Sequence, residues 1–426
     1  MTTSVTSPEN QTPARAVIRA AKSEIAEVAD AIRQEAVDRE LNSLDPRPRV
    51  RELAAAGIGR LRVPEEFGGL GADVSDLAEV LVDLAAADSN FVQIFRGHLG
   101  FVEFLVDRDP DPVRDELLNA IGRGELVGPA ASVPAAGQPG GPTAESIIDH
   151  STTLTERSGR NILNGTKYYT TGSLYSDWIS VVVVDDDGVK EVVVRADDPG
   201  VTVVDDWNGF GQRFTASGTA MFSDVEVREG YDLERTDPAI DAYLGAFYQF
   251  IHSATQAGII RRITEDLRDV VRRRHRTYPL ATVPEPQHDP QVLEVVGGVD
   301  TARFAAEAAV GALAGSFDDY NVSHSQSDLE KVGIRSAQVQ ILNTRLSAEA
   351  SWNLFNAASA SATSTDLALD RHWRNVRTIS SHNPVIYKAR AVGDYVVNGA
   401  VPDVHRGFGA RHDDPDDGFR KPDAPL

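Results

Sequence analysis

Two histidines stand in segments whose neighbouring residues could prepare them for proton transfer. His382 lies in RHWRNVRTISSHNPVIYKARAVGDYVVNG, residues 371–399, directly before Asn383 and Pro384. Because asparagine is a common N-cap and proline a common first helical residue, the sequence predicts a helix that begins at Pro384 and ends near Gly399. The positive end of a helix disfavours an imidazolium, so His382 is expected to be neutral and able to act as a general base. The same spacing also fits a surface histidine that merely precedes a helix.

The second histidine, His98, lies in NFVQIFRGHLGFVEFLV, a helix-like segment that is apolar on nearly every side. A helix of this composition is buried, and its polar residues Gln93, Arg96, His98 and Glu103 need partners. His98 is therefore either a core histidine whose hydrogen bonds are satisfied or a side chain that points into a ligand cavity.

Helical spacing of apolar residues governs the first part of the chain, which we place in an all-helical domain at residues 1–125, with residues 1–13 expected to be disordered. Residues 14–40 and 51–56 predict helices, and two more are expected after Val74, the second capped by an Asp-Ser-Asn segment. Between them, GIGRLRVPEEFGGLGAD is rich in glycine. It follows neither the dinucleotide nor the P-loop spacing, so it predicts a structured turn rather than a phosphate loop.

Strand-like alternation replaces this pattern in residues 126–232. Runs rich in valine and threonine alternate between two faces, which predicts an antiparallel β domain. Three turn signals separate the runs: Asn164-Gly165, Asp187-Gly188 and Asp198-Pro199-Gly200.

Long helical patterns return in residues 233–400, before a tail at residues 401–426. Four helices are expected to form an antiparallel bundle, at residues 242–274, 291–314, 328–360 and from Pro384. The order of helices, β domain and helices differs from the βαβ alternation of a Rossmann protein, and no GxGxxG follows a predicted strand. A nicotinamide site is therefore unsupported.

The composition limits the class of protein. The chain has 426 residues, 41% of them hydrophobic, and a formal net charge of -22, which argues against nucleic acid or an anionic membrane as a partner. There is no cysteine, so disulfides, thiolate catalysis and cysteine-ligated metals are excluded, and no metal site is expected. The start of the sequence lacks the layout of a signal peptide and no apolar run reaches membrane-spanning length, so we expect a cytoplasmic protein.

Several motifs resemble the acyl-CoA dehydrogenase superfamily over nearly the whole chain: RVPEEFGGLGAD, LNGTKYYTTGSLYSDW, GFGQRFTASGTAMFSDVEV and WRNVRT. The resemblance implies an α+β fold with an N-terminal helical domain, a middle antiparallel β-barrel domain and a C-terminal four-helix bundle. LAAADSNFVQIFRGHLGFVE, DDWNGFGQRFTASGT and the segment around His382 resemble most the flavin-dependent monooxygenase branch. That branch includes dibenzothiophene and dimethylsulfone-type monooxygenases and nitrososynthases.

A departure from the dehydrogenase pattern supports this branch. Acyl-CoA dehydrogenases commonly abstract the substrate α-proton with a glutamate in a Tyr-Glu-Gly-Thr-like segment. The matching stretch here, from Ile379 to Pro384, reads ISSHNP and has no carboxylate, so thioester oxidation loses its base. Some dehydrogenases carry that glutamate on another helix.

The resemblance implies roles for particular residues. Thr170 and Thr171 should contact the polar edge of the isoalloxazine, and Trp207 should pack beside the flavin or substrate. Four polar residues are expected on the phosphate side of the flavin, in part from a neighbouring subunit: Arg213, Ser217, Arg274 and Arg276. His98 and His382 match the two histidines associated with the active site of dibenzothiophene-type enzymes.

The resemblance also implies the reaction and the partners. Reduced FMN, supplied by a separate NAD(P)H:flavin reductase, would react with O2 to a C4a-hydroperoxyflavin that oxygenates a sulfur, nitrogen or aromatic carbon atom of a small molecule; FAD is less expected. His382 would abstract a substrate proton or hold the peroxide by a hydrogen bond, with His98 facing it. Ile379 replaces a further histidine common in that branch, which argues against a sulfur heterocycle. Loops 133–142 and 277–290 should shape the pocket.

A homotetramer is expected by the same resemblance. Two other interpretations remain open: an acyl-CoA dehydrogenase with tightly bound FAD, and a non-catalytic scaffold that keeps only the fold.

Overall fold

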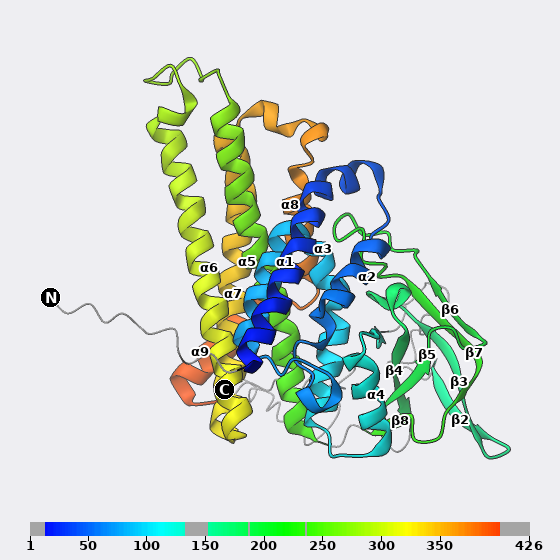
Figure 1. Ribbon diagram of the computed structural model, residues 1–426. Helices are drawn as coiled ribbons and strands as arrows, with labels where there is room; N and C mark the ends of the chain where they lie inside the picture. The colour runs from blue at the N-terminus through cyan, green and yellow to red at the C-terminus, as the bar shows by residue number, and fades with distance from the viewer. Residues whose placement is uncertain (1–12, 133–151, 186–187, 235–236, 401–426) are drawn as a thin grey trace, which may run out of the picture.

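The computed structural model describes residues 13–132, 152–185, 188–234 and 237–400. The expected tail and loop 133–142 lie outside these ranges, as do the first twelve residues. Figure 1 shows the long helices α5, α6 and α7 side by side at one side of the molecule and the strands at the other, with α1 and α3 between them.

The N-terminal part is helical, as predicted. Its four helices are α1 (Pro13–Asn42), α2 (Arg47–Ala56), α3 (Val74–Asp107) and α4 (Pro112–Gly122). Short 3-10 turns at Ile58–Arg60 and Glu65–Phe67 make up the structured loop between α2 and α3. A Cβ on Gly69 would meet Val63 O at 1.9 Å. This glycine is therefore required by the packing of the turn on itself.

Helix α3 is interrupted at Asp88, where the backbone is extended (φ -161°, ψ 116°). The Asp88 carboxylate accepts from the backbone N (3.0 Å) and the side-chain Nδ2 (2.7 Å) of Asn90. Asp88 thus acts as an N-cap inside the element, as the sequence signal predicted, and α3 consists of two successive helices. The second of them carries Gln93, Arg96 and His98.

The middle part contains two four-stranded sheets. In the first sheet the order is β1-β4-β5-β8, and in the second it is β2-β3-β7-β6. The strands are β1 (Val127–Ala130), β2 (Thr153–Arg157), β3 (Arg160–Lys167), β4 (Trp178–Asp185), β5 (Gly188–Arg195), β6 (Val201–Val204), β7 (Thr219–Val227) and β8 (Asp232–Glu234). All these pairs are antiparallel except β1 with β4, which is parallel.

The turn predicted at Asn164-Gly165 is wrong. Both residues lie within β3, where the register with β7 shifts between Leu163 and Gly165, so the signal marks a β-bulge. The tight turn between β2 and β3 is formed instead by Ser158-Gly159, both with positive φ.

The turn predicted at Asp198-Pro199-Gly200 is present. Gly200 has φ +90°, and the backbone N of Val201 donates to Asp198 O (3.1 Å). This turn leads from β5 into the other sheet rather than closing a hairpin. In the third signal, Asp187 lies outside the described residues.

The C-terminal part is helical. Its helices are α5 (Pro238–Arg273), α6 (Pro290–Ser323), α7 (Gln326–Ala358), α8 (Asp370–Ser381) and α9 (Lys388–Asn398). Helices α5, α6 and α7 pack on one another, and α3 packs on α5 and α6. An aromatic cluster lies at their centre, formed by Tyr243, Phe247, Phe250 and Phe317.

The fourth predicted helix of this domain is present as α9, which begins at Lys388 rather than at Pro384 and packs on α7. Within the ranges that the structure describes, no helix is both long and apolar enough to cross a membrane.

Candidate active site

His382 lies at the C-terminal end of α8, not at the start of a helix. Pro384 is extended (φ -64°, ψ 108°), and the next α-helix begins only at Lys388. The predicted helix start is wrong because a tertiary contact holds this turn: Nε2 of Gln340, on α7, donates to Asn383 O (3.1 Å). The helix-dipole argument for a neutral His382 therefore fails.

His382 is nevertheless held neutral, by its surroundings. Burial and, to a smaller extent, the positive charge of Arg96 lower the pKa of His382 to about 3. Nη1 of Arg96 lies 3.4 Å from Nε2 of His382. Because a guanidinium can only donate, a neutral His382 in this contact carries its proton on Nδ1.

A third basic side chain completes the group. His252, in the middle of α5, meets the His382 ring edge-on, with 4.7 Å between the ring centroids. Burial and then the charge of Arg96 lower the pKa of His252 well below the ordinary value of histidine. Arg96, His252 and His382 thus join three helices that are distant in sequence, and we call them the Arg-His-His cluster.

The helices that carry this cluster also carry buried polar atoms that have no hydrogen-bond partner among the described residues. They include Oε1 of Gln93, one turn before Arg96 on α3, together with Oε1 of Gln249 and Nε2 of His252 on α5. Nε2 of Gln256 donates to Ser380 Oγ (3.0 Å), while its Oε1 is unsatisfied. Since buried polar groups are nearly always hydrogen-bonded, these atoms indicate a place where water or a ligand binds.

His98 does not belong to the cluster. Its Nε2 donates to Gly59 O (2.9 Å), and its Nδ1 accepts from the backbone N of Val127 (3.0 Å). Burial lowers the pKa of His98 to about 4. Both ring nitrogens are thus engaged by backbone groups, which is the arrangement of a satisfied core histidine. The position opposite His382 is filled by Arg96 and His252 instead.

The β domain contributes a chain of hydroxyl groups. Oγ1 of Thr171 lies 2.7 Å from Oγ of Ser217, which lies 2.7 Å from Oγ1 of Thr215. The side chain of Thr170 is buried and donates to Gly218 O (3.0 Å), so its role here is to hold two loops together. Thr171 is therefore the better placed of the two predicted threonines to contact a ligand.

Thr171 is also close to α3. The next residue, Gly172, has φ +84°, and a Cβ there would lie 2.3 Å from Ile94 O. Only glycine allows the Thr171-Gly172 segment to lie directly on the helix, beside Gln93. The hydroxyl chain and the polar residues of α3 therefore share one region of the molecule.

An aromatic shelf borders the same region. Tyr169, which is 48% exposed, meets Trp207 edge-on with 6.0 Å between centroids. Phe210 stacks on Trp373 of α8 with 5.6 Å between centroids, and both rings are about half exposed. The loop turns closely around Trp207, since a Cβ on Gly209 would lie 1.9 Å from the indole. Such exposed flat rings suit a planar heterocycle such as a flavin.

The three predicted phosphate-binding arginines lie in different surroundings. Arg213 contacts Glu40 through both its carboxylate (3.2 Å) and its carbonyl (3.3 Å). Arg274 donates to Ala357 O (2.6 Å) and to Arg276 O, at the end of α7. Arg276 is exposed, and no side-chain hydrogen bond or ion pair joins it to another described residue. Arg276 is thus the one best placed to receive an anion.

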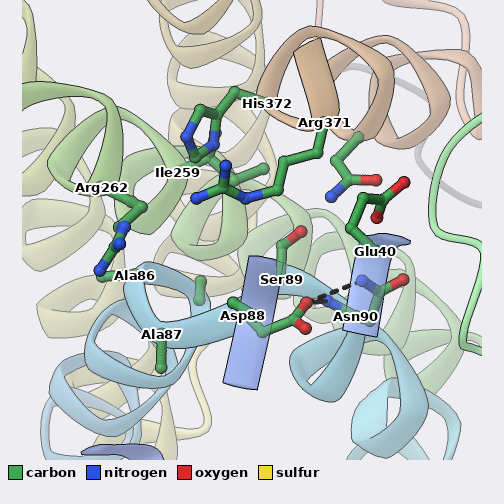
Figure 2. A pocket seen from close by; sticks show the side chains of 13 residues that line it. Glu40, Ala86, Ala87, Asp88, Ser89, Asn90, Ile259, Arg262, Arg371 and His372 are labelled. Carbon is green, nitrogen blue, oxygen red and sulfur yellow. Dashed lines mark hydrogen bonds between the residues drawn. The ribbon is translucent and has the colours of Figure 1, made fainter. Parts of the chain in front are cut away.

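A small charged cavity lies beyond this region, between α1, α3, α5 and α8 (Figure 2). Its walls include Glu40, Asp88, Arg371 and His372, and its volume of about 20 Å³ has room for a water but not for a flavin ring. Nε2 of His372 lies 2.8 Å from Oδ2 of Asp266. These charges fix α8 against its neighbours, and none of the predicted site residues lines this cavity.

Sequence reasoning missed His252 and the role of Arg96. Arg96 was recognised only as a polar residue in a buried helix, and His252 stands in a long helix whose face toward the site cannot be inferred from periodicity alone. In the described part of the chain, no group of histidine and acidic side chains could hold a metal ion.

The fold combines a β domain with a helical domain, whose helices α3, α5 and α8 bring together the Arg-His-His cluster. Family models agree with it. Acyl-CoA dehydrogenase N-terminal, middle and C-terminal domains match residues 7–125, 141–225 and 250–386. The chain belongs to the acyl-CoA dehydrogenase superfamily.

Curated relatives are more specific. The chain is 29% identical to a dibenzothiophene monooxygenase of Mycolicibacterium goodii over 372 residues, which cover 82% of this chain and 87% of that protein. It is 30% identical to L-evernosamine nitrososynthase of Micromonospora sp. over 317 residues, 71% of this chain and 70% of that protein. It is 25% identical to the probable FMNH2-dependent monooxygenase SfnC of Pseudomonas putida, over 92% and 97% of the two chains.

Solved structures share the fold. The FMN-bound dibenzothiophene monooxygenase TdsC from Paenibacillus sp. A11-2 superposes with a TM-score of 0.82 at 25% identity, over 92% of this chain and all of the other. The resemblance inferred from the motifs is thereby confirmed at the level of superfamily and fold.

Proposed function

We propose that this protein is a flavin-dependent monooxygenase that uses reduced FMN and O2 to oxygenate a small organic molecule at a sulfur, nitrogen or aromatic carbon atom. The relatives named above are monooxygenases or a nitrososynthase, and one is described as FMNH2-dependent. FMN is preferred to FAD because a fold neighbour at 25% identity is an FMN complex.

One observation carries this proposal over acyl-CoA oxidation. Among the described residues, no aspartate or glutamate makes an ion pair or hydrogen bond with Arg96 or His252. Abstraction of an α-proton from a thioester needs a positioned base, and a histidine with a pKa of about 3 is a poor one near neutral pH. Oxygen transfer from a flavin does not require a carboxylate.

The residues present fit an FMN. The shelf of Tyr169, Trp207 and Phe210 would receive the ring system, and Thr171 would meet its polar edge. When bound, reduced FMN supplies the oxygen-activating chemistry through a C4a-hydroperoxide. The protein must therefore bind and orient the flavin and the substrate, and it must exclude water. Arg276 would hold the phosphate, while Arg213 and Arg274 position the segments around it.

His382 then acts as a hydrogen-bond partner rather than as a base. Its low pKa keeps the ring neutral, and the contact from Arg96 fixes the proton on Nδ1. The neutral ring would hold the reacting oxygen atoms by a hydrogen bond. His98 takes no part in this scheme, because its two nitrogens are occupied by Gly59 O and the backbone N of Val127.

We further propose that a separate NAD(P)H:flavin reductase delivers the reduced FMN, as the description of the FMNH2-dependent relative supports. The protein would work in the cytoplasm, where NAD(P)H is available.

A homotetramer is proposed as well. Large apolar side chains that are more than half exposed occur on the outer helices: Phe304 on α6, Trp352 on α7, and Val396 and Val397 on α9. Exposed apolar side chains of this size commonly mark protein interfaces.

Rapid mixing tests the function. The protein is loaded anaerobically with reduced FMN and mixed with oxygenated buffer while the flavin spectrum is followed. A C4a-hydroperoxide that outlasts the free flavin is expected, and His382→Ala should shorten its lifetime about tenfold, the effect of one lost hydrogen bond to a charged or reacting group. Oxidation at the rate of free flavin, together with bleaching of bound FAD by an acyl-CoA, would establish a dehydrogenase instead.

A further inference from the structure

Arg96 carries a positive charge within the fold, and no carboxylate of the described residues pairs with it. Its Nη1 contacts His382, and its Cζ lies 4.6 Å from the centroid of the Tyr248 ring, while its Nε has no hydrogen-bond partner. Arg39, Arg62 and Arg371 are also enclosed, and each lies against an aspartate or glutamate. The charge of Arg96 is the exception.

An uncompensated charge in this position needs an explanation. Burial lowers the pKa of Arg96 to about 10, so the group remains protonated at neutral pH. Removing a cation from water without a counter-ion costs several kcal/mol in proteins, which is why such groups are normally paired. Neutral histidines and an aromatic face offset only part of that cost.

The groups around Arg96 are suited to an oxyanion. His252 has a buried Nε2 without a partner, and Gln93 and Gln249 each have an unsatisfied amide oxygen. An amide can rotate and present its N–H groups, so these side chains can meet either a donor or an acceptor. The guanidinium offers forked donors that match a carboxylate or a sulfur oxyanion.

We propose that Arg96 binds an anionic oxygen group of the substrate, with His252 and the neighbouring glutamines completing the site. The substrate is then a small organic acid, a carboxylate or a sulfur oxyanion, whose oxidisable atom is presented toward the aromatic shelf. That the bound anion is the substrate rests on the proposed function. The geometry at Arg96 supports anion binding in either case.

Calorimetry on the flavin-free protein tests the binding. The probes are 3-(methylthio)propionate and its neutral analogue 3-(methylthio)propanamide, with ethanesulfinate to compare the two kinds of oxyanion. The wild type should bind the propionate at least about tenfold more tightly than the amide, as expected for a charge-assisted hydrogen bond. Arg96→Met should abolish this preference, and Arg96→Lys should keep part of it. Arg268→Met, at an exposed arginine of α5 paired only with Asp269, is the matched control.

Stability gives a second readout. Because Arg96→Met removes an uncompensated buried charge, the midpoint of urea unfolding without ligand should stay equal or rise. The propionate should raise that midpoint in the wild type and not in the variant. A purely structural arginine would give the opposite result, a lower midpoint for Arg96→Met.

The outcomes separate the two proposals. Equal affinity of the wild type for propionate and amide overturns the anion site, whatever the variants do. Loss of FMN affinity in Arg96→Met with an unchanged preference would show that Arg96 serves the flavin. If the anion preference depends on Arg96 but no oxygenated flavin accumulates, the binding site stands and the monooxygenase assignment fails. An oxygenated flavin with no anion preference gives the reverse conclusion.

Discussion

At the scale of single residues, the two histidines predicted for the active site, His98 and His382, have different surroundings. His98 is closed off by two backbone hydrogen bonds, whereas His382 contacts two basic side chains from other helices. A neutral imidazole is found in both places, since burial lowers both pKa values. What distinguishes them is whether a ring nitrogen can reach anything other than the protein backbone.

This difference predicts opposite mutant phenotypes. His98→Leu leaves Gly59 O and the backbone N of Val127 buried without partners, which should cost about 3 kcal/mol of unfolding free energy. Oxygenation per FMN oxidised should stay near the wild-type value in the folded fraction. Urea unfolding and a product-to-FMN ratio measure the two effects.

The matched variant is His382→Leu, which should change stability little and lower the ratio of product to oxidised FMN. If His98→Leu kept its full stability but gave less product per FMN oxidised, His98 would have to take part in the reaction.

At the scale of elements, the junction between the β domain and α8 is held by a few specific bonds. The backbone N of Gln212 donates to Asn375 Oδ1 (2.8 Å), and Arg374 donates to Phe210 O (3.0 Å). A Cβ on Gly211 would lie 2.3 Å from Arg374 O. The loop that carries the aromatic shelf is thus fastened to the helix that carries His382 near its end.

Asn375→Ala should therefore loosen the shelf. The lost acceptor leaves a buried N–H unpaired, at a cost of about 1–2 kcal/mol, and the affinity for FMN should fall about tenfold. Fluorescence titration with FMN measures this change. Asn356→Ala, at an exposed asparagine of α7 bonded to Asn353, is the control and should leave the affinity unchanged. Equal affinities in the two variants would mean that this bond does not position the FMN site.

The same scale shows what could be predicted from the sequence. In helices such as α1 and α5 the apolar residues recur with helical spacing, so each helix could be predicted from its own segment of the sequence. The true start of the last helix could not be predicted in this way. A hydrogen bond from Gln340 to Asn383, which are 43 residues apart, overrides the local capping signal before Pro384. His382 and Arg96 are separated by 286 residues, and no local pattern encodes such a contact.

At the scale of the whole molecule, histidines whose pKa values are lowered in the folded protein make folding sensitive to acid. Burial lowers the pKa of His98 and His372 to about 4 and of His382 to about 3, and places that of His252 well below its usual value. An unfolded histidine titrates near pH 6.5, so below that pH the unfolded chain binds more protons than the folded one. Stability must therefore fall with decreasing pH.

The expected loss runs from about pH 6.5 down to about pH 4, at about 1.4 kcal/mol per pH unit for each fully titrating histidine. Urea unfolding at a series of pH values measures the slope. His98→Gln should reduce it by one proton. A wild-type slope of zero between pH 6 and 5 would mean that these imidazoles are already protonated in the folded protein.

The extended backbone at Asp88 affects which insertions and deletions the protein can tolerate during evolution. In an unbroken helix, inserting or deleting one residue rotates everything beyond it by about 100°. At Asp88 the helix is interrupted, and the second half of α3 begins from its own N-cap. The rotation of the second half about the helix axis is therefore not fixed by the number of residues in the first half. The first half can therefore vary in length or packing without turning Gln93 and Arg96 away from their partners. The part of α3 that carries Gln93 and Arg96 is therefore independent of changes in the part that precedes Asp88.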